Sequence, residues 1–123
     1  MKGNGKRILI IEDEPDVAET MKMLLEREGY YAEYTLDPRK ALGMMPKFDL
    51  VLLDIMMPIM SGREVLAEIR KRGIKTPVIV VSAVGLPMEM ERELAVKYPG
   101  VRFLSKTLIA TDLAKEAGKM LGR

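Results

Sequence analysis

The stretch Leu50 to Gly62, LVLLDIMMPIMSG, carries the clearest structural signal in the chain. Its first four residues are apolar, which predicts a short strand buried on both faces, as strands of parallel sheets are. This strand leads directly into Asp54, and the chain then turns at Pro58. A lone charge is costly to bury unless it is paired or bound to a cation. The rest of the sequence should therefore supply a partner for Asp54.

The composition bounds the kind of protein. With 123 residues, of which 48% are hydrophobic and 31% charged, the chain has the size and composition of one globular domain. We expect a single domain over residues 1–123, with no output domain after it. A net charge of +2 gives no electrostatic case for binding nucleic acid or an acidic membrane. The chain has neither cysteine nor histidine, which excludes disulfides and thiol chemistry and removes the commonest metal ligand. No signal peptide or membrane span is evident, so we expect a cytoplasmic location.

Short apolar runs alternate with helical patterns along the whole sequence. The predicted strands are 7–11, 31–35, 49–53, 77–81 and 101–104, and the predicted helices are 15–29, 37–45, 61–73, 87–98 and 109–121. This alternation predicts an α/β fold, a doubly wound five-stranded parallel sheet with helices on both faces. The flavodoxin-like strand order 2-1-3-4-5 is expected. It makes the second strand an edge, which agrees with the polar residues in YAEYT.

Five reactive side chains follow the ends of the strands nearest the point where the strand order reverses. They are Glu12, Asp13, Asp54, Ser82 and Lys106. Ligands of open α/β sheets bind at this edge. Two carboxylates 4 Å apart repel by about 4 kcal/mol at an effective dielectric near 20. Either some carboxylates are protonated, or a divalent cation such as Mg²⁺ lies among them.

A bound cation would make a second anion favourable at this edge. Ser82 and Lys106 are suitable donors to a phosphoryl group, and Asp54 would then be its acceptor. Each residue also has a simpler explanation when taken alone. The acidic run can favour a helix N-terminus, Ser82 can cap a helix, and Lys106 can be solvated. Their combined placement favours a site.

Four segments carry a resemblance to a known family. They are Ile10–Glu14, Leu52–Pro58 with Gly62, Val80–Ala83 and Phe103–Lys106. In this order and at these spacings, they resemble the receiver domain of two-component response regulators, of the single-domain, chemotaxis-regulator-like kind. The resemblance extends over essentially the whole chain. It implies a phosphoacceptor switch rather than an enzyme that acts on a released substrate.

The resemblance also implies roles for individual residues. Asp54 would be phosphorylated by a sensor histidine kinase or a phosphotransfer protein. Asp13, Asp54 and the backbone carbonyl of Met56 would ligate Mg²⁺, and Glu12 would act largely through water. Ser82 and Lys106 would bind the phosphoryl oxygens.

The same resemblance implies how a signal would leave the site. Phe103 occupies the aromatic switch position, and Ser82 would move with it. The surface formed by helix 87–98, the fifth strand and the last helix would then change toward an unknown separate protein. A monomer or weak dimer is expected.

Two features depart from the family pattern. Thr107 follows Lys106 where many receivers have a proline, often after a cis bond. A cis bond before a non-proline residue costs about 3 kcal/mol, so this bond is either trans, with a differently shaped loop, or strained. The segment Tyr98–Val101 also differs from the common pattern before the fifth strand.

Three other functions remain open. A phosphatase with an aspartyl nucleophile usually has a second aspartate two residues later, and Met56 occupies that position. A flavin- or nucleotide-binding domain of the same fold would need a Gly-rich or hydroxyl-rich first loop, whereas Glu12–Pro15 would repel phosphate. A degenerate receiver that serves only as a protein-interaction module would have no need of Asp13, Asp54, Ser82 and Lys106, all of which are present.

Overall fold

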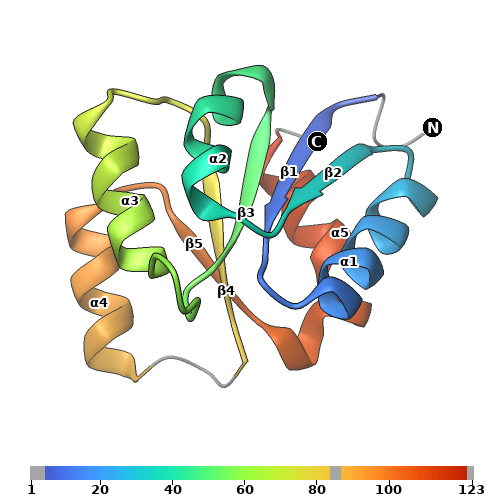
Figure 1. Cartoon of the computed structure of the whole chain (residues 1–123). Coiled ribbons are helices and arrows are strands. Elements are labelled where there is room, and N and C mark those ends of the chain that lie inside the picture. Colours follow the sequence, from blue (N-terminus) through green and yellow to red (C-terminus); the bar gives the residue numbers. More distant parts are fainter. Residues whose placement is uncertain (1–4, 84–86, 122–123) are drawn as a thin grey trace.

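The computed structural model describes residues 5–83 and 87–121 of the chain. Five strands alternate with five α-helices (Figure 1). In chain order they are β1 (Arg7–Ile11), α1 (Pro15–Arg27), β2 (Tyr31–Thr35), α2 (Pro38–Met44), β3 (Leu50–Asp54), α3 (Gly62–Lys71), β4 (Val78–Ser82), α4 (Met88–Lys97), β5 (Arg102–Ser105) and α5 (Ile109–Met120). Two short 3₁₀ turns follow α2 and β5, at Met45–Lys47 and Lys106–Leu108.

The five strands form one parallel sheet in the order β2-β1-β3-β4-β5, so the predicted fold class and strand order are confirmed. The third, fourth and fifth strands begin and end one residue later than predicted. Asp54 is the last residue of β3 because it pairs with Val81, and the amide of Ile55 donates to the carbonyl of Val81 at 3.0 Å. Ser82 is likewise the last residue of β4. Both side chains are therefore held by the sheet itself.

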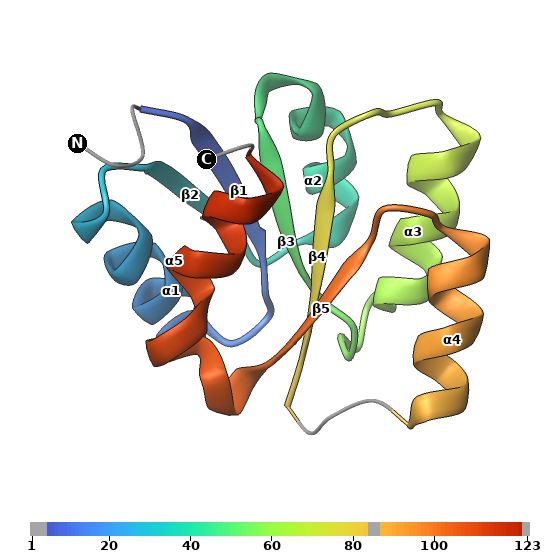
Figure 2. The same ribbon diagram turned by 180° about the vertical axis from the view of Figure 1, so that it is seen from behind.

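The helices form a layer on each face of the sheet. Helices α1 and α5 cover one face, and α2, α3 and α4 cover the other (Figures 1 and 2). Successive strand residues point to opposite faces of the sheet and pack into two separate hydrophobic cores. Leu9 and Val51 belong to the core under α2, α3 and α4, whereas Ile10 and Leu52 belong to the core under α1 and α5.

Local sequence signals explain where several helices begin. Pro15 stands at the start of α1, where its missing N–H costs nothing. Asp37 caps α2 by accepting from the amide of Arg39, as the Asp37-Pro38 pair indicates. The predicted capping box is present at α3, since Ser61 and Glu64 each accept from the other's backbone amide.

Helix α4 is the most weakly anchored of the long helices. Of its residues, only Leu94 is buried, and Pro87 provides no side-chain cap. Tyr98, just after the helix, adds one more buried ring. The sequence of α4, MEMERELAVK, is polar and offers few apolar residues to the sheet. Helix α4 therefore rests on a narrow apolar contact.

None of the helices in the described part of the chain is both long enough and apolar enough to cross a membrane.

Candidate functional site

Three carboxylates meet at the carboxyl edge of the sheet, as the strand order predicts. Glu12 follows β1, Asp54 ends β3, and both are buried, at 0% and 2% exposure. One oxygen each from Glu12, Asp13 and Asp54 lies within 4.8 Å of the others. Glu12 Oε1 is buried and has no hydrogen-bond partner among the described residues. A hard cation such as Mg²⁺ fits this set, because it prefers carboxylate oxygens and could bind the Glu12 oxygen that accepts no hydrogen bond from the described residues.

Lys106 is the cation that faces this cluster. Its Nζ lies 2.8 Å from Glu12 Oε1, 3.4 Å from Asp54 Oδ2 and 3.6 Å from Glu14 Oε1. The contact with Glu12 is an ion pair without hydrogen-bond geometry, whereas the contact with Asp54 is a long hydrogen bond. The sequence did not indicate Glu14 as a partner of Lys106. The only available signal was its place in the Glu12–Glu14 run beside the strand end.

The two oxygens of Asp54 have different surroundings. Oδ1 accepts a hydrogen bond from the amide of Met56 at 3.0 Å, and Oδ2 faces Lys106. The pKa of Asp54 is raised to about 7, and burial is the main cause. The nearby Glu12 also raises it, whereas the Met56 amide and Lys106 lower it. Burial lowers the pKa of Lys106, but Glu12 and Asp54 more than reverse this effect and raise it overall.

A close turn between β3 and α3 holds the segment after Asp54 in place. The amide of Gly62 donates to the carbonyl of Ile55 at 3.0 Å. A Cβ atom on Gly62 would lie 2.6 Å from the Cα of Ile55, closer than real Cβ atoms come. This turn therefore requires glycine. The side chain of Met56 is 72% exposed beside the cluster.

The remaining predicted residues lie on the two neighbouring strands. Ser82, 6% exposed, ends β4 one residue beyond the partner of Asp54. Phe103 of β5 pairs with Val80 and is half-buried against the core under α4. Five of the predicted residues, Glu12, Asp13, Asp54, Ser82 and Lys106, are thus at one edge of the sheet, and Phe103 is set back from it.

The loop after Lys106 departs from the family pattern. Of the two alternatives for the peptide bond between Lys106 and Thr107, the structure has the trans one. The structure contains no cis peptide bond among the described residues, so the strained alternative is wrong. The chain instead forms a 3₁₀ turn, in which Ser105 Oγ accepts from the amide of Thr107 at 3.3 Å and lies 2.8 Å from its hydroxyl. Lys106 still reaches Asp54 from this turn.

The raised pKa of Asp54 predicts a pH-dependent stability of the metal-free protein. The folded state holds this proton up to about pH 7, whereas the ordinary pKa is 3.8. Its stabilising contribution is therefore complete below about pH 4 and is lost as the pH rises through about 7. We expect the Asp54→Asn variant to be more stable than the native chain when both are measured in chelator. The difference between their free energies of unfolding should increase by about 1–3 kcal/mol from about pH 5 to pH 8. Urea unfolding of both proteins across this range measures the difference. A constant difference would contradict the assigned protonation.

Comparisons with known proteins agree with this geometry. The family model of the response regulator receiver domain matches residues 8–117. The transcriptional regulatory protein YbdJ of Bacillus subtilis is 39% identical over 79 residues, which cover 64% of this chain and 35% of that protein. DltR of Streptococcus agalactiae is 40% identical over 79 residues, covering 63% of this chain and 35% of that protein. The matched segment is thus about a third of the length of these relatives.

Solved structures of receiver domains are similar over nearly the whole chain. The signal receiver domain of a LuxO repressor protein from Vibrio parahaemolyticus has a TM-score of 0.85 at 30% identity, covering 94% of this chain and 89% of that one. The receiver domain of the histidine kinase CKI1 from Arabidopsis thaliana, complexed with Mg²⁺, has a TM-score of 0.79 at 27% identity, covering 94% and 92%. The chain therefore belongs to the response regulator receiver domain family.

Proposed function

We propose that this chain is a phosphoacceptor switch that takes a phosphoryl group onto Asp54 from a histidine kinase or phosphotransfer protein. The observation that carries the proposal is the position of Asp54, buried at the end of β3 and 3.4 Å from Lys106 within a cluster of three carboxylates. The expected site of action is the cytoplasm.

Transfer would form a mixed anhydride. An Asp54 carboxylate oxygen bonds to phosphorus while the bond from phosphorus to the donor's imidazole nitrogen breaks and the imidazole keeps the electron pair. Mg²⁺, which the CKI1 receiver holds, would be ligated by Asp13, Asp54 and the Met56 carbonyl, with Glu12 acting through water, and would neutralise charge at the phosphoryl oxygens. Lys106 and Ser82 would donate to those oxygens.

The chemistry is self-directed, so we do not propose an enzyme with a released substrate. An aspartyl phosphatase would need a second acid or base near the phosphoryl group. The position two residues after Asp54 holds the exposed, apolar Met56. A nucleotide-binding domain is disfavoured because Glu12 is fully buried beside the first loop.

Phosphoryl uptake and its need for a cation test this proposal. Incubated with acetyl phosphate and Mg²⁺, the protein should gain one acid-labile phosphoryl group, and peptide mapping should place it on Asp54. Chelation should slow uptake by at least about tenfold, because the clustered carboxylates then repel the donor. Uptake at another residue, or at the same rate in chelator, would contradict the proposal.

Ser82 and Phe103 are proposed to pass the signal to the α4–β5–α5 surface. Phosphorylation adds up to about two negative charges, which can recruit the Ser82 hydroxyl and the Lys106 ammonium. Movement of Ser82 would free space for Phe103, now half-buried, to rotate inward. A change in the ratio of active to inactive conformation from about 1:99 to 99:1 needs about 5.5 kcal/mol of differential stabilisation. A few charge-assisted hydrogen bonds of roughly 1.5–3 kcal/mol each can supply it.

Amide chemical shifts measure this coupling. On phosphorylation with Mg²⁺, we expect shift changes in α4, β5 and α5 as well as around Asp54. Ser82→Ala should keep the changes near Asp54 and lose most of those in α4 and β5, whereas Thr20→Ala, which removes an exposed hydroxyl of α1, should keep both. Changes confined to the loops around Asp54 in the native protein would contradict the proposed route.

A further inference from the structure

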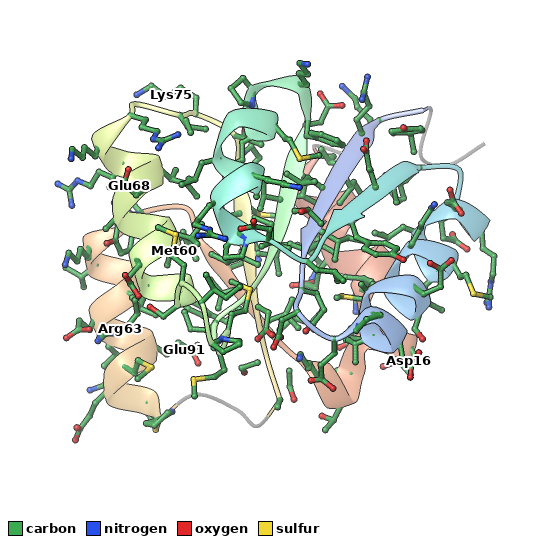
Figure 3. The ribbon with its side chains drawn as sticks, viewed as in Figure 1. Asp16, Met60, Arg63, Glu68, Lys75 and Glu91 are labelled. Carbon is green, nitrogen blue, oxygen red and sulfur yellow. The ribbon has the colours of Figure 1, made fainter. Side chains whose placement is uncertain are left out.

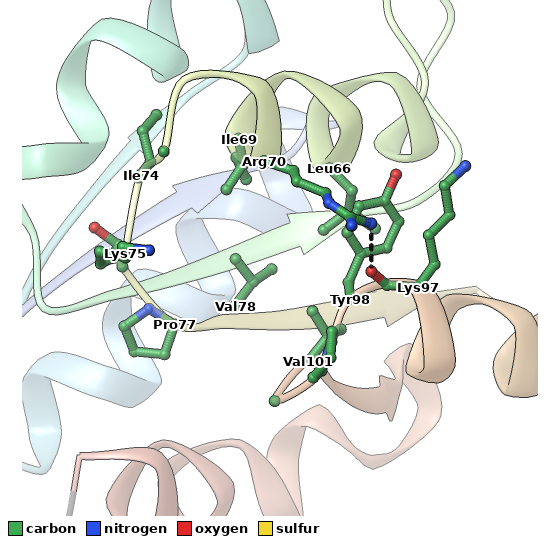
Figure 4. Close-up of a pocket in the computed structure, with 14 residues that line it drawn as sticks. Leu66, Ile69, Arg70, Ile74, Lys75, Pro77, Val78, Lys97, Tyr98 and Val101 are labelled. Atoms are coloured by element: carbon green, nitrogen blue, oxygen red, sulfur yellow. Dashed lines mark hydrogen bonds between the residues drawn. The ribbon is translucent and has the colours of Figure 1, made fainter.

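A pocket of about 440 Å³ opens at the edge of the sheet opposite Asp54. It lies where α3 and α4 end, beside the start of β4 at Val78 (Figure 4). Figure 3 shows Lys75, one of its lining residues, at the far end of the molecule from Asp16, which lies near the acidic run. The pocket is therefore separate from the phosphoacceptor site.

The walls of the pocket are apolar and belong to the core. The buried residues in these walls are Leu66, Ile69, Val78 and Tyr98, and Ile74 and Val101 pack partly against the same core.

The two loops at the mouth of the pocket turn sharply at glycines, with φ of 67° at Gly73 and 93° at Gly100. Only glycine adopts these values readily, so the backbone keeps both corners free of side chains.

The charges around the pocket are all positive. Arg70, Lys75 and Lys97 line it, and none of its lining residues is acidic. The Arg70 guanidinium is held by a hydrogen bond from Nη1 to the carbonyl of Lys97 at 3.0 Å (Figure 4). This is its only hydrogen bond among the described residues, and a guanidinium has five donors.

Two other arginines in and just after α3 have carboxylate partners, whereas Arg70 has none among the described residues. Arg63 pairs with Glu93, and Arg72 pairs with Glu68. Within residues 5–83 and 87–121, Arg70 has no carboxylate partner within ion-pair distance. Basic residues at a helix C-terminus complement its dipole, but this effect does not account for the cavity beside Arg70.

We propose that this pocket binds a small organic anion, a compound with an apolar aromatic or branched body and one carboxylate, sulfonate or phosphate group. The body would rest against Leu66, Ile74 and Val101, and the charged group would bind Arg70 and Lys97. A volume of about 440 Å³ lies within the range typical of small-molecule sites. Charge complementarity selects the anion, since a cation would meet three like charges.

The test uses the full-length chain and the fluorescent probe 8-anilinonaphthalene-1-sulfonate, an aromatic body with one sulfonate. We expect one saturable site, with amide shift changes at Ile74 and Val101. The neutral analogue N-phenyl-1-naphthylamine, which lacks the sulfonate, should bind at least about tenfold more weakly. Binding without saturation, equal binding of the neutral analogue, or shift changes centred elsewhere would overturn the proposal.

Charge variants identify the residues responsible. The double substitution Arg70→Gln with Lys97→Gln should weaken sulfonate binding at least about tenfold and leave the neutral analogue unaffected. Lys75→Gln alone should weaken sulfonate binding about threefold. Because Lys75 is exposed, this variant tests the proposal even if the double variant disturbs the contact between α3 and α4. Lys115→Gln, an exposed lysine of α5 outside the pocket, is the matched control and should leave affinity unchanged. Unchanged affinity in both pocket variants would overturn the assignment.

Discussion

Replacing Asp54 with asparagine is expected to abolish phosphoryl uptake. The substitution preserves size and removes the anionic oxygen that must bond to phosphorus, and an amide is a poor nucleophile. We expect labelling by acetyl phosphate with Mg²⁺ to fall at least about 100-fold, which corresponds to about 2.7 kcal/mol in the barrier. Incorporated phosphate per chain, measured over time for both proteins, gives the ratio.

The fold should survive this change, so that a loss of labelling reports chemistry. The Met56 amide donates to Asp54 Oδ1, and the carbonyl oxygen of an asparagine can accept the same hydrogen bond. Asp16→Asn is the matched control, because Asp16 is an exposed acidic residue of the first turn of α1. It should label like the native protein. Labelling that persists in Asp54→Asn would refute the site.

The phosphorylated protein is expected to lose its phosphoryl group slowly. Hydrolysis needs a water in line with the bond between phosphorus and Asp54. In receivers, the side chains two residues beyond the phosphorylated aspartate and two beyond the hydroxyl residue flank this path, and here they are Met56 and Val84. Met56 is 72% exposed at the cluster and cannot orient water by a hydrogen bond, whereas Val84 lies outside the described residues.

Polar residues at both positions should speed this loss. We expect Met56→Asn with Val84→Glu to shorten the lifetime by about 10- to 100-fold, at about 1.4 kcal/mol for each tenfold. Met56→Leu, which stays apolar, should change little. Decay after removal of the donor, with Mg²⁺ present, is the measurement. A native half-life of seconds, or an unchanged double variant, would show that these side chains do not limit hydrolysis.

The sequence predicted the sheet and its site edge because both depend on local signals. Apolar runs such as Leu50–Leu53 mark buried strands, and the polar alternation of Tyr31–Thr35 marks an edge strand, which the structure confirms. Since parallel strands end at one edge, the residues after those ends had to converge.

The finer features depend on contacts that no local pattern encodes. Lys106 reaches Glu14 and Glu12 through a long side chain that extends from the 3₁₀ turn after β5. Sequence spacing does not specify which carboxylates lie within its reach. The loop at Thr107 had two possible shapes, and the structure shows that hydroxyl contacts with Ser105 accompany the trans one. Asp54 and Ser82 proved to be strand residues because backbone pairing extends one position beyond the apolar run.

The narrow apolar contact of α4 has a consequence for hydrogen exchange. Its apolar contacts are those of Leu94, the partly buried Met90 and the adjoining Tyr98. Two surface contacts also tie it to α3, the Arg63–Glu93 ion pair and the Arg70–Lys97 hydrogen bond. Such contacts contribute little free energy in water. Segments with few buried apolar contacts open to solvent at a cost well below that of global unfolding. The amides of α4 would thus exchange through sub-global opening, while β3, buried along its whole length, would exchange only when the entire domain unfolds.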